Sequence, residues 1–124
     1  MNFIIKKCLK CGALVEVMKD CNCENCGIKC CGESMVELKP NTFEASAEKH
    51  LPIYRVNGDE IIASVPHVME PEHYIEWIAL VSTNGVEKKY FKPGDSTEGV
   101  FPYIKNSKLY AYCNKHSLWE ITVK

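Results

Sequence analysis

The sequence lacks any long apolar run. Its 124 residues contain nothing near the roughly 18 consecutive apolar residues that a membrane span needs, and the apolar run at residues 3–5 is too short for the core of a secretory signal. We therefore expect a cytoplasmic protein that does not bind membranes. An excess of basic residues is also missing, because the net charge is −1. The scattered lysines form no basic face for nucleic acid.

The cysteines are distributed unevenly, which indicates two separate uses. Seven of the eight lie between Cys8 and Cys31, and the eighth, Cys113, stands alone near the C-terminus. Cytosolic thiols are kept reduced, so clustered cysteines there are more often metal ligands than disulfides. The first 36 residues also have almost no aromatic residues with which to build a core. Such a segment needs a staple, and a thiolate-bound metal supplies one because its binding energy becomes folding energy.

The rest of the chain is typical of an all-β domain. Turn signals at residues 57–59, 84–85 and 93–95 separate runs rich in Ile, Val, Tyr and Trp. No helical period, internal repeat or low-complexity segment is present. The pattern predicts an immunoglobulin-like antiparallel β-sandwich. Its seven strands are expected at residues 53–57, 61–65, 74–82, 87–91, 99–103, 109–113 and 118–123.

We place a domain boundary in residues 37–41, where Pro40 and Asn41 interrupt the pattern. This gives a small cysteine-rich module at residues 1–36, which contains one expected strand at 13–18. The β-sandwich domain follows at residues 37–124.

The N-terminal module contains a metal-binding pair, Cys8 and Cys11. Their two-residue spacer lets both sulfur atoms face one ion, and the following glycine relieves the tight turn. The spacing does not decide which cysteines form the second pair of ligands. Cys23-x-x-Cys26 repeats the two-residue spacer, and the adjacent pair Cys30-Cys31 competes with it. Four thiolates suit zinc and iron equally, so the spacing does not choose the metal.

The second candidate site combines Cys113 with four histidines, the only ones in the chain. Cys113 and His116 have the two-residue spacing that places a thiolate and an imidazole on one ion at a strand end. Three further histidines lie in segments typical of ligand loops, namely His50, His67 and His73. A blue-copper (cupredoxin-like) electron carrier is the rival, but it needs only two histidines and usually a late methionine. No methionine follows Cys113.

Three segments resemble the signature stretches of superoxide reductases in order and spacing: residues 48–52, residues 64–69 with 73–78, and residues 113–116. The N-terminal cysteines add to this likeness, because Cys8-x-x-Cys11 with Cys30-Cys31-Gly32-Glu33 resembles the rubredoxin-like (desulforedoxin-like) module of desulfoferrodoxins, which residues 1–36 would then form. The resemblance to the desulfoferrodoxin family, the two-iron superoxide reductases, covers essentially the whole chain. The C-terminal motifs are specific, whereas a bare Cys-x-x-Cys is not.

This resemblance implies an enzyme that reduces superoxide to hydrogen peroxide at a mononuclear iron with one open position. Lys49 would steer the anion and help water deliver a proton, and Glu48 would ligate the oxidised iron after the product leaves. The iron ligands would be His50, His67, His73, Cys113 and His116. A second iron for electron transfer, with zinc as the other metal possible there, would be held by Cys8, Cys11, Cys30 and Cys31.

The family further implies a rubredoxin-like electron donor and a homodimer. Two features depart from its pattern: a longer spacer that contains Cys21, Cys23 and Cys26, and Lys115, which stands where the family has an apolar residue. Two other functional classes remain as alternatives to the enzyme. One is a non-catalytic electron carrier, and the other is a zinc-stapled module for protein interaction.

Overall fold

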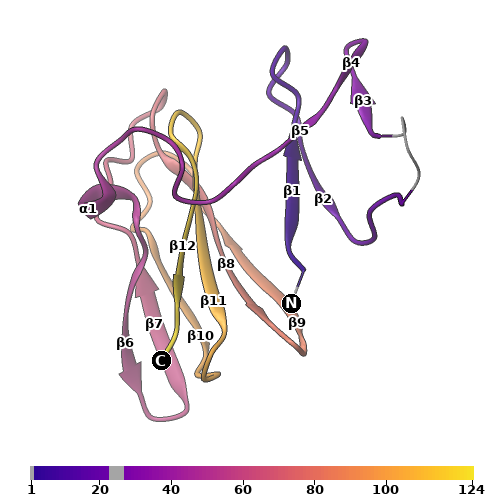
Figure 1. Cartoon of the computed structure of the whole chain (residues 1–124). Helices are drawn as coiled ribbons and strands as arrows, with labels where there is room; N and C mark the ends of the chain where they lie inside the picture. Colours follow the sequence, from indigo (N-terminus) through magenta and orange to yellow (C-terminus); the bar gives the residue numbers. More distant parts are fainter. Residues whose placement is uncertain (1, 23–26) are drawn as a thin grey trace. The chain divides into compact units, whose positions relative to one another are not determined.

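The computed structural model describes residues 2–22 and 27–124, whose regular structure is almost entirely strand (Figure 1). The chain divides into two compact units, one ending at Lys39 and the other beginning at Pro40. The division lies three residues after the predicted end of the first domain, because strand β5 (Val36–Glu37) pairs with strand β1 (Ile4–Lys7). In the described residues, no helix is long and apolar enough to cross a membrane.

The N-terminal unit is built around β1. This strand lies between β5 and β2 (Leu14–Val17), and both neighbours are antiparallel to it. A short hairpin of β3 (Lys29–Cys30) and β4 (Glu33–Ser34) completes the described part of the unit. Few of its described side chains are buried; the apolar ones are Ile5, Cys8, Val17 and Met35.

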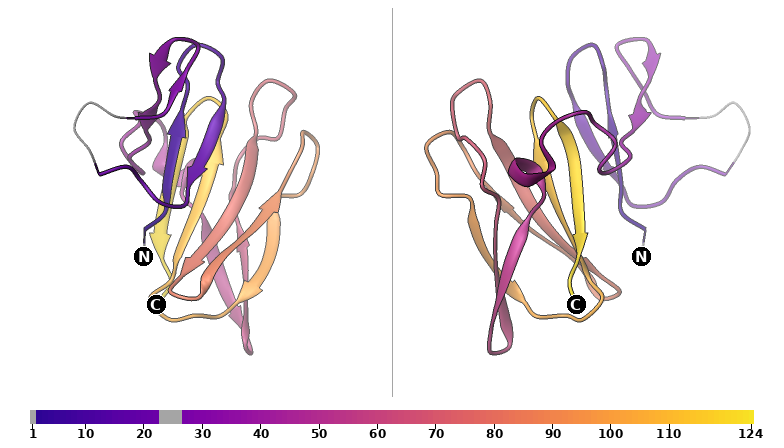
Figure 2. Two further views of the ribbon diagram at one scale, coloured as in Figure 1. Left: turned by 90° about the vertical axis from the view of Figure 1, so that its right-hand side faces the viewer. Right: turned by 60° about the vertical axis from the view of Figure 1, so that its left-hand side comes forward.

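The C-terminal unit is an antiparallel sandwich of two sheets, whose arrangement can be followed in Figures 1 and 2. The three-stranded sheet has the order β10 (Glu98–Pro102), β7 (Glu60–Ser64), β6 (Ile53–Asn57). The four-stranded sheet has the order β12 (Ser117–Thr122), β11 (Lys108–Cys113), β8 (Ile75–Ser82), β9 (Gly85–Tyr90). The all-β fold class and the seven strands of the sandwich are confirmed, with ends that differ from the predicted ones by at most two residues.

The sandwich core lies between these two sheets. Ile61 of β7 and Phe101 of β10 belong to the same buried cluster as Ile78 of β8 and Leu109 of β11. Along β7 and β10 buried side chains alternate with more exposed ones, as expected for sheets that have one face against the core. Cys113 is part of this buried cluster, so one candidate ligand is held directly by the core.

Five of the described elements were not predicted from the sequence: the strands β1, β3, β4 and β5 of the N-terminal unit, and one helix. Residues Ala47–His50 form a one-turn helix, α1, where the sequence suggested only a ligand loop. The turn is too short to show a helical period. It ends at Leu51 because the residue before a proline is disfavoured in the helical conformation, and Pro52 follows.

Candidate metal centres

The structure brings the four histidines and Cys113 together at one end of the sandwich. One ligating atom from each lies within 4.8 Å of the corresponding atom of every other. His50 is the last residue of α1, and His67 and His73 lie in the connection between β7 and β8. Cys113 ends β11, and His116 lies in the turn that leads to β12. The five residues therefore come from three separate segments of one domain.

The donor atoms are spaced as ligands of a single ion. His50 Nε2 lies 3.2 Å from His67 Nε2 and 2.9 Å from His116 Nδ1. Two neighbouring nitrogen atoms at about 2.1 Å from one metal ion are separated by about 3.0 Å. His73 Nε2 is buried and has no hydrogen-bond partner in the described structure. A buried nitrogen without a partner is costly, and a metal ion among these donors would satisfy it.

Backbone carbonyl groups orient two of the imidazole rings. His50 Nδ1 donates to the carbonyl of Ser46 at 2.7 Å, one helical turn earlier. His67 Nδ1 donates to the carbonyl of Val68 at 2.5 Å. A proton on Nδ1 leaves the lone pair on Nε2, the atom that faces the other donors.

The Cys113 sulfur is placed by the hairpin between β11 and β12. Cys113 pairs with Ser117 across a three-residue turn, and Ser117 has the positive φ (68°) that such hairpins require. The register between β11 and β8 also shifts next to Cys113, and such irregularities often redirect a side chain beside a functional site. The backbone N–H of His116 donates to the sulfur at 3.4 Å. Burial raises the pKa of the free thiol, and a cation bound beside the sulfur would favour the thiolate.

The His73 loop contains a tight turn. Glu70 and His73 exchange two backbone hydrogen bonds of 3.0 Å, and Pro71 occupies the second position of the turn, which it favours. The Asn114 side chain holds this loop from the other strand connection. Its Oδ1 accepts from the Tyr74 N–H at 2.9 Å, and its Nδ2 donates to the Glu72 carbonyl at 3.0 Å.

Trp119 supports the site from β12. Its ring stacks on the His50 ring with centroids 5.0 Å apart, and its Nε1 donates to the His116 carbonyl at 2.8 Å. The other tryptophan, Trp77 of β8, stacks on Tyr112 of β11. Sequence reasoning missed both Trp119 and Asn114. The only available signal for Asn114 was its position next to Cys113.

The site favours the neutral form of three imidazoles, those of His50, His67 and His73. Burial lowers the pKa of His50, His67 and His73 below the usual value. The Lys49 ammonium lowers the pKa of His50 and His67 further, so its charge acts on the site although the side chain is exposed. Neutral imidazole is the form that binds a metal.

Two other charged residues flank the site. Glu48 is exposed on α1 beside Lys49. Lys115 is exposed in the β11–β12 turn, and its charge adds to the lowering of the His73 pKa and counteracts the raised pKa of Cys113.

The N-terminal unit holds a second group of donors, the sulfur atoms of Cys8, Cys11, Cys30 and Cys31, all within 4.8 Å of one another. Cys11 Sγ lies 3.6 Å from Cys30 Sγ, and Cys30 Sγ lies 3.9 Å from Cys31 Sγ. Sulfur atoms at about 2.3 Å from a tetrahedral ion are separated by about 3.8 Å. Cys31 itself has φ of 54°, the turn that lets adjacent cysteines face one ion.

Two thiols of this cysteine group have pKa values that are shifted in opposite directions. The backbone N–H of Cys11 lowers the pKa of Cys8 to about 6. Cys11 and the other neighbouring thiols raise the pKa of Cys30 to about 12. Four sulfurs this close cannot all be anionic without a cation, so the group fits a metal ion. The alternative pair, Cys23 and Cys26, lies outside the described residues.

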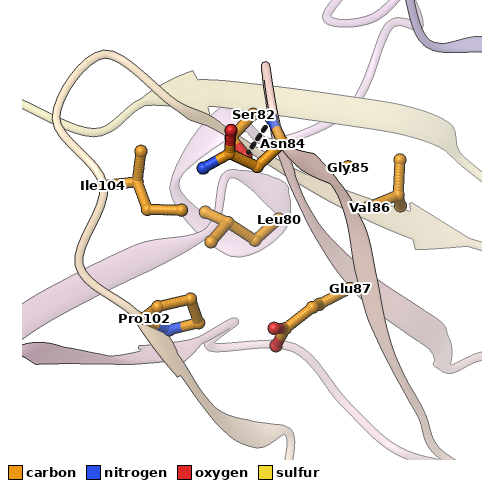
Figure 3. A pocket seen from close by; sticks show the side chains of 8 residues that line it. All are labelled: Leu80, Ser82, Asn84, Gly85, Val86, Glu87, Pro102 and Ile104. Atoms are coloured by element: carbon orange, nitrogen blue, oxygen red, sulfur yellow. Dashed lines mark hydrogen bonds between the residues drawn. The ribbon is translucent and has the colours of Figure 1, made fainter.

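A shallow groove of about 200 Å³ lies at the opposite end of the sandwich (Figure 3). Leu80 and Pro102 form part of its wall, and the Asn84 N–H donates to the Ser82 hydroxyl at 3.1 Å beside it. None of its lining residues is a histidine or a cysteine. The metal-binding chemistry of the sandwich is therefore separate from this groove.

Comparison with known proteins identifies the family to which these sites belong. Residues 42–122 match the family model described as Desulfoferrodoxin. The chain belongs to the desulfoferrodoxin family. It is 40% identical over 119 residues to the desulfoferrodoxin of Syntrophotalea carbinolica, covering 93% of this chain and 92% of that protein. The resemblance inferred from the motifs is confirmed, and iron is the cofactor of the family.

Two further proteins that resemble this chain are named superoxide reductases. A superoxide reductase of Pyrococcus abyssi is 33% identical over 112 residues, covering 62% of this chain and 87% of that protein. The crystal structure of the superoxide reductase from Treponema pallidum superposes with a TM-score of 0.73 at 24% identity, covering 98% of this chain and 100% of that chain. The latter shows that both units of this desulfoferrodoxin have a known fold.

Proposed function

We propose that this desulfoferrodoxin is a superoxide reductase, which converts superoxide, one electron and two protons into hydrogen peroxide. The observation that carries the proposal is the convergence of four imidazoles and one thiolate in a single group. Five protein donors leave one position of a six-coordinate ion for an outside ligand, which distinguishes a reactive metal from a structural one. The family similarity to named superoxide reductases agrees with this chemistry.

The ligands of the catalytic iron would be His50, His67, His73, Cys113 and His116. Bound iron supplies the single electron, and its neutral imidazoles leave the site cationic, which attracts a small anion. The Cys113 thiolate donates electron density, which favours oxidation of the metal. The Cys113 residue is buried, and its sulfur accepts a hydrogen bond from the backbone N–H of His116. The fold therefore protects this donor from solvent.

Lys49 and Glu48 would act at the rim of this site. The Lys49 ammonium acts on the pKa of His50 and His67, so it is close enough to attract superoxide toward the same rings. Its exposed position lets water exchange at the ammonium group and deliver protons to the product. Glu48, exposed on the same helical turn, would ligate the oxidised metal.

The N-terminal iron would be held by Cys8, Cys11, Cys30 and Cys31 and would relay electrons. Four thiolates complete a tetrahedral shell, so no position remains for superoxide. Cys11 and Cys31 are exposed, which suits electron exchange with a partner. We propose a rubredoxin-like donor for this role, and a reducing, cytoplasmic location in which these thiols stay available to the metal.

We also propose a homodimer, with the outer face of the β10-β7-β6 sheet as the contact. Ile62 lies between Arg55 and Val100 across this face, and Ile53 lies beside them on β6. Ile53 and Val100 are 55% and 45% exposed. A two-fold axis through this apolar centre would set Arg55 of one copy against Glu98 of the other. Val100→Glu should then give a monomer in sedimentation, and a monomeric unaltered protein would exclude this interface.

The function is tested by product stoichiometry. Anaerobically reconstituted protein with a chemical electron donor should form one hydrogen peroxide per superoxide and release no dioxygen. Release of one dioxygen per peroxide would indicate dismutation, and an unchanged superoxide decay would leave a non-catalytic electron carrier. Absence of iron from the C-terminal group after anaerobic reconstitution would refute the proposed centre.

Lys49→Ala tests the role of the rim charge. The second-order rate with superoxide should fall about tenfold at low salt, because one attractive charge is lost near the entrance. The salt dependence of the rate should weaken at the same time. Lys105→Ala is the matched control, since this exposed lysine precedes β11 and lies at least one strand length from Cys113. Equal rates for the two variants would remove the role assigned to Lys49.

A further inference from the structure

The Asn114 side chain binds the backbone on both sides of His73. It accepts from the Tyr74 N–H at 2.9 Å and donates to the Glu72 carbonyl at 3.0 Å. Its own backbone N–H donates to the Tyr74 carbonyl at 3.2 Å. These bonds connect segments 40 and 42 positions apart in the sequence.

His73 depends on its backbone for its position. The rings of His50 and His67 are each held by a hydrogen bond from Nδ1 to a carbonyl. In the part of the chain that the structure describes, the ring of His73 has no such bond, and its buried Nε2 has no partner. The location of this ring is therefore set by where the flanking residues Glu72 and Tyr74 are fixed.

We infer that Asn114 is a positioning residue for the metal centre, which fixes His73 relative to Cys113. Because Asn114 directly follows Cys113, its three hydrogen bonds tie the thiolate segment to the imidazole loop. The inference rests on the proposed role of His73 and Cys113 as ligands of one ion. Residues that orient ligands in this way typically change metal affinity ten- to hundredfold when they are replaced.

A second asparagine provides a closely matched comparison. Asn41 donates through Nδ2 to the Glu120 carbonyl at 3.1 Å and accepts at Oδ1 from the Glu120 N–H at 2.9 Å. Its backbone N–H donates to the Leu118 carbonyl at 3.0 Å. Asn41 therefore makes the same three kinds of bond as Asn114, but the strand segment it holds contains no metal ligand and touches the site only through Trp119, whose ring stacks on His50 and whose Nε1 bonds the His116 carbonyl.

The experiment compares Asn114→Ala with Asn41→Ala in the full-length protein. Each variant loses two side-chain hydrogen bonds, and Asn41→Ala also places an alanine at a positive φ of 63°, which asparagine tolerates better, so its melting temperature should fall at least as much as that of Asn114→Ala. The affinity of the C-terminal group for Fe²⁺, measured by competition with a chelator, should fall at least tenfold in Asn114→Ala and less than twofold in Asn41→Ala. The N-terminal cysteine site serves as an internal control, because its affinity should not change in either variant.

Two results would overturn the inference. One is an unchanged Fe²⁺ affinity in Asn114→Ala, and the other is an equal loss of affinity in both variants, which would make Asn114 a general stabilising residue. Asn114→Asp covers the case in which Asn114→Ala does not fold, because it keeps the acceptor for the Tyr74 N–H. Its Fe²⁺ affinity should also fall, since the bond to the Glu72 carbonyl is lost, and an unchanged value would contradict the inference.

Amide exchange of the metal-free protein separates this inference from the proposed reaction. The Tyr74 amide should exchange at least tenfold faster in Asn114→Ala than in Asn41→Ala, whatever the protein does with superoxide. Equal exchange of the Tyr74 amide would show that the side chain does not hold the loop. A failure to reduce superoxide with intact Fe²⁺ binding would refute the proposed function and leave the positioning role intact.

Discussion

The two metal centres differ in what surrounds them. The C-terminal group lies in a sandwich whose core already fixes Cys113, with His50 also buried. The N-terminal group lies in a unit with few buried apolar residues, and of its four sulfurs only that of Cys8 belongs to a buried residue. The sandwich therefore positions its ligands before metal binds, whereas the small unit needs the metal for its own stability.

This contrast separates the roles of the two centres. A reactive metal benefits from rigid ligands and one free position, because the fold and not the substrate then sets the geometry. A four-thiolate site is closed to substrate and suits electron transfer, and two of its cysteines, Cys11 and Cys31, are exposed. Iron can therefore serve catalysis in one unit and electron relay in the other.

Removal of both metals should give the largest difference between the units. After chelation under reducing conditions, the amides of β1 and β2 should exchange at least a thousandfold faster, because thiolate-metal binding supplies most of the stability of such small units. The amides of β8 and β11 should keep their protection, since the buried cluster remains. Retained protection in β1 and β2 would show that the N-terminal unit folds without metal.

Replacement of single cysteines sharpens the assignment of the N-terminal site. Cys30→Ser should abolish the stable N-terminal metal, because the sulfur of Cys30 lies 3.6 Å from Cys11 Sγ and 3.9 Å from Cys31 Sγ. Cys21→Ser, at an exposed cysteine outside the group, is the control and should retain the full metal content. Two metals per chain in Cys30→Ser would favour Cys23 and Cys26 as the second pair.

The smallest effect is expected from the charge of Lys115. Lys115→Leu should lower the midpoint potential of the C-terminal iron by tens of millivolts, because loss of a nearby cation favours the oxidised, more positive metal. The N-terminal potential should not change, and spectroelectrochemistry would measure both. A large loss of activity, or a higher C-terminal potential, would contradict the solvent-exposed position of this side chain.

Much of the sandwich could be predicted because turn residues mark where its strands end. Asn57-Gly58 and Asn84-Gly85 lie at hairpins, and Gly58 and Gly85 both have positive φ. The helix α1 could not be predicted, since a single turn leaves no periodic pattern. The division between the units, after Lys39, lies within the predicted boundary region at residues 37–41, whereas strand β5 could not be predicted because its two residues are recognisable only through their pairing with β1.

The sequence by itself determined the types of donor and their local spacing. Cys8-x-x-Cys11 and Cys113-x-x-His116 each place two donors on one short turn, and short turns are governed by local backbone geometry.

Tertiary structure decided which of these pieces meet. His50 approaches His67 and His116 only because α1 and two strand connections lie at the same end of the sandwich. Likewise, Asn114 reaches Tyr74 only because β11 pairs with β8. Contacts between residues this far apart depend on strand pairing and core packing, and no local pattern of residues records them.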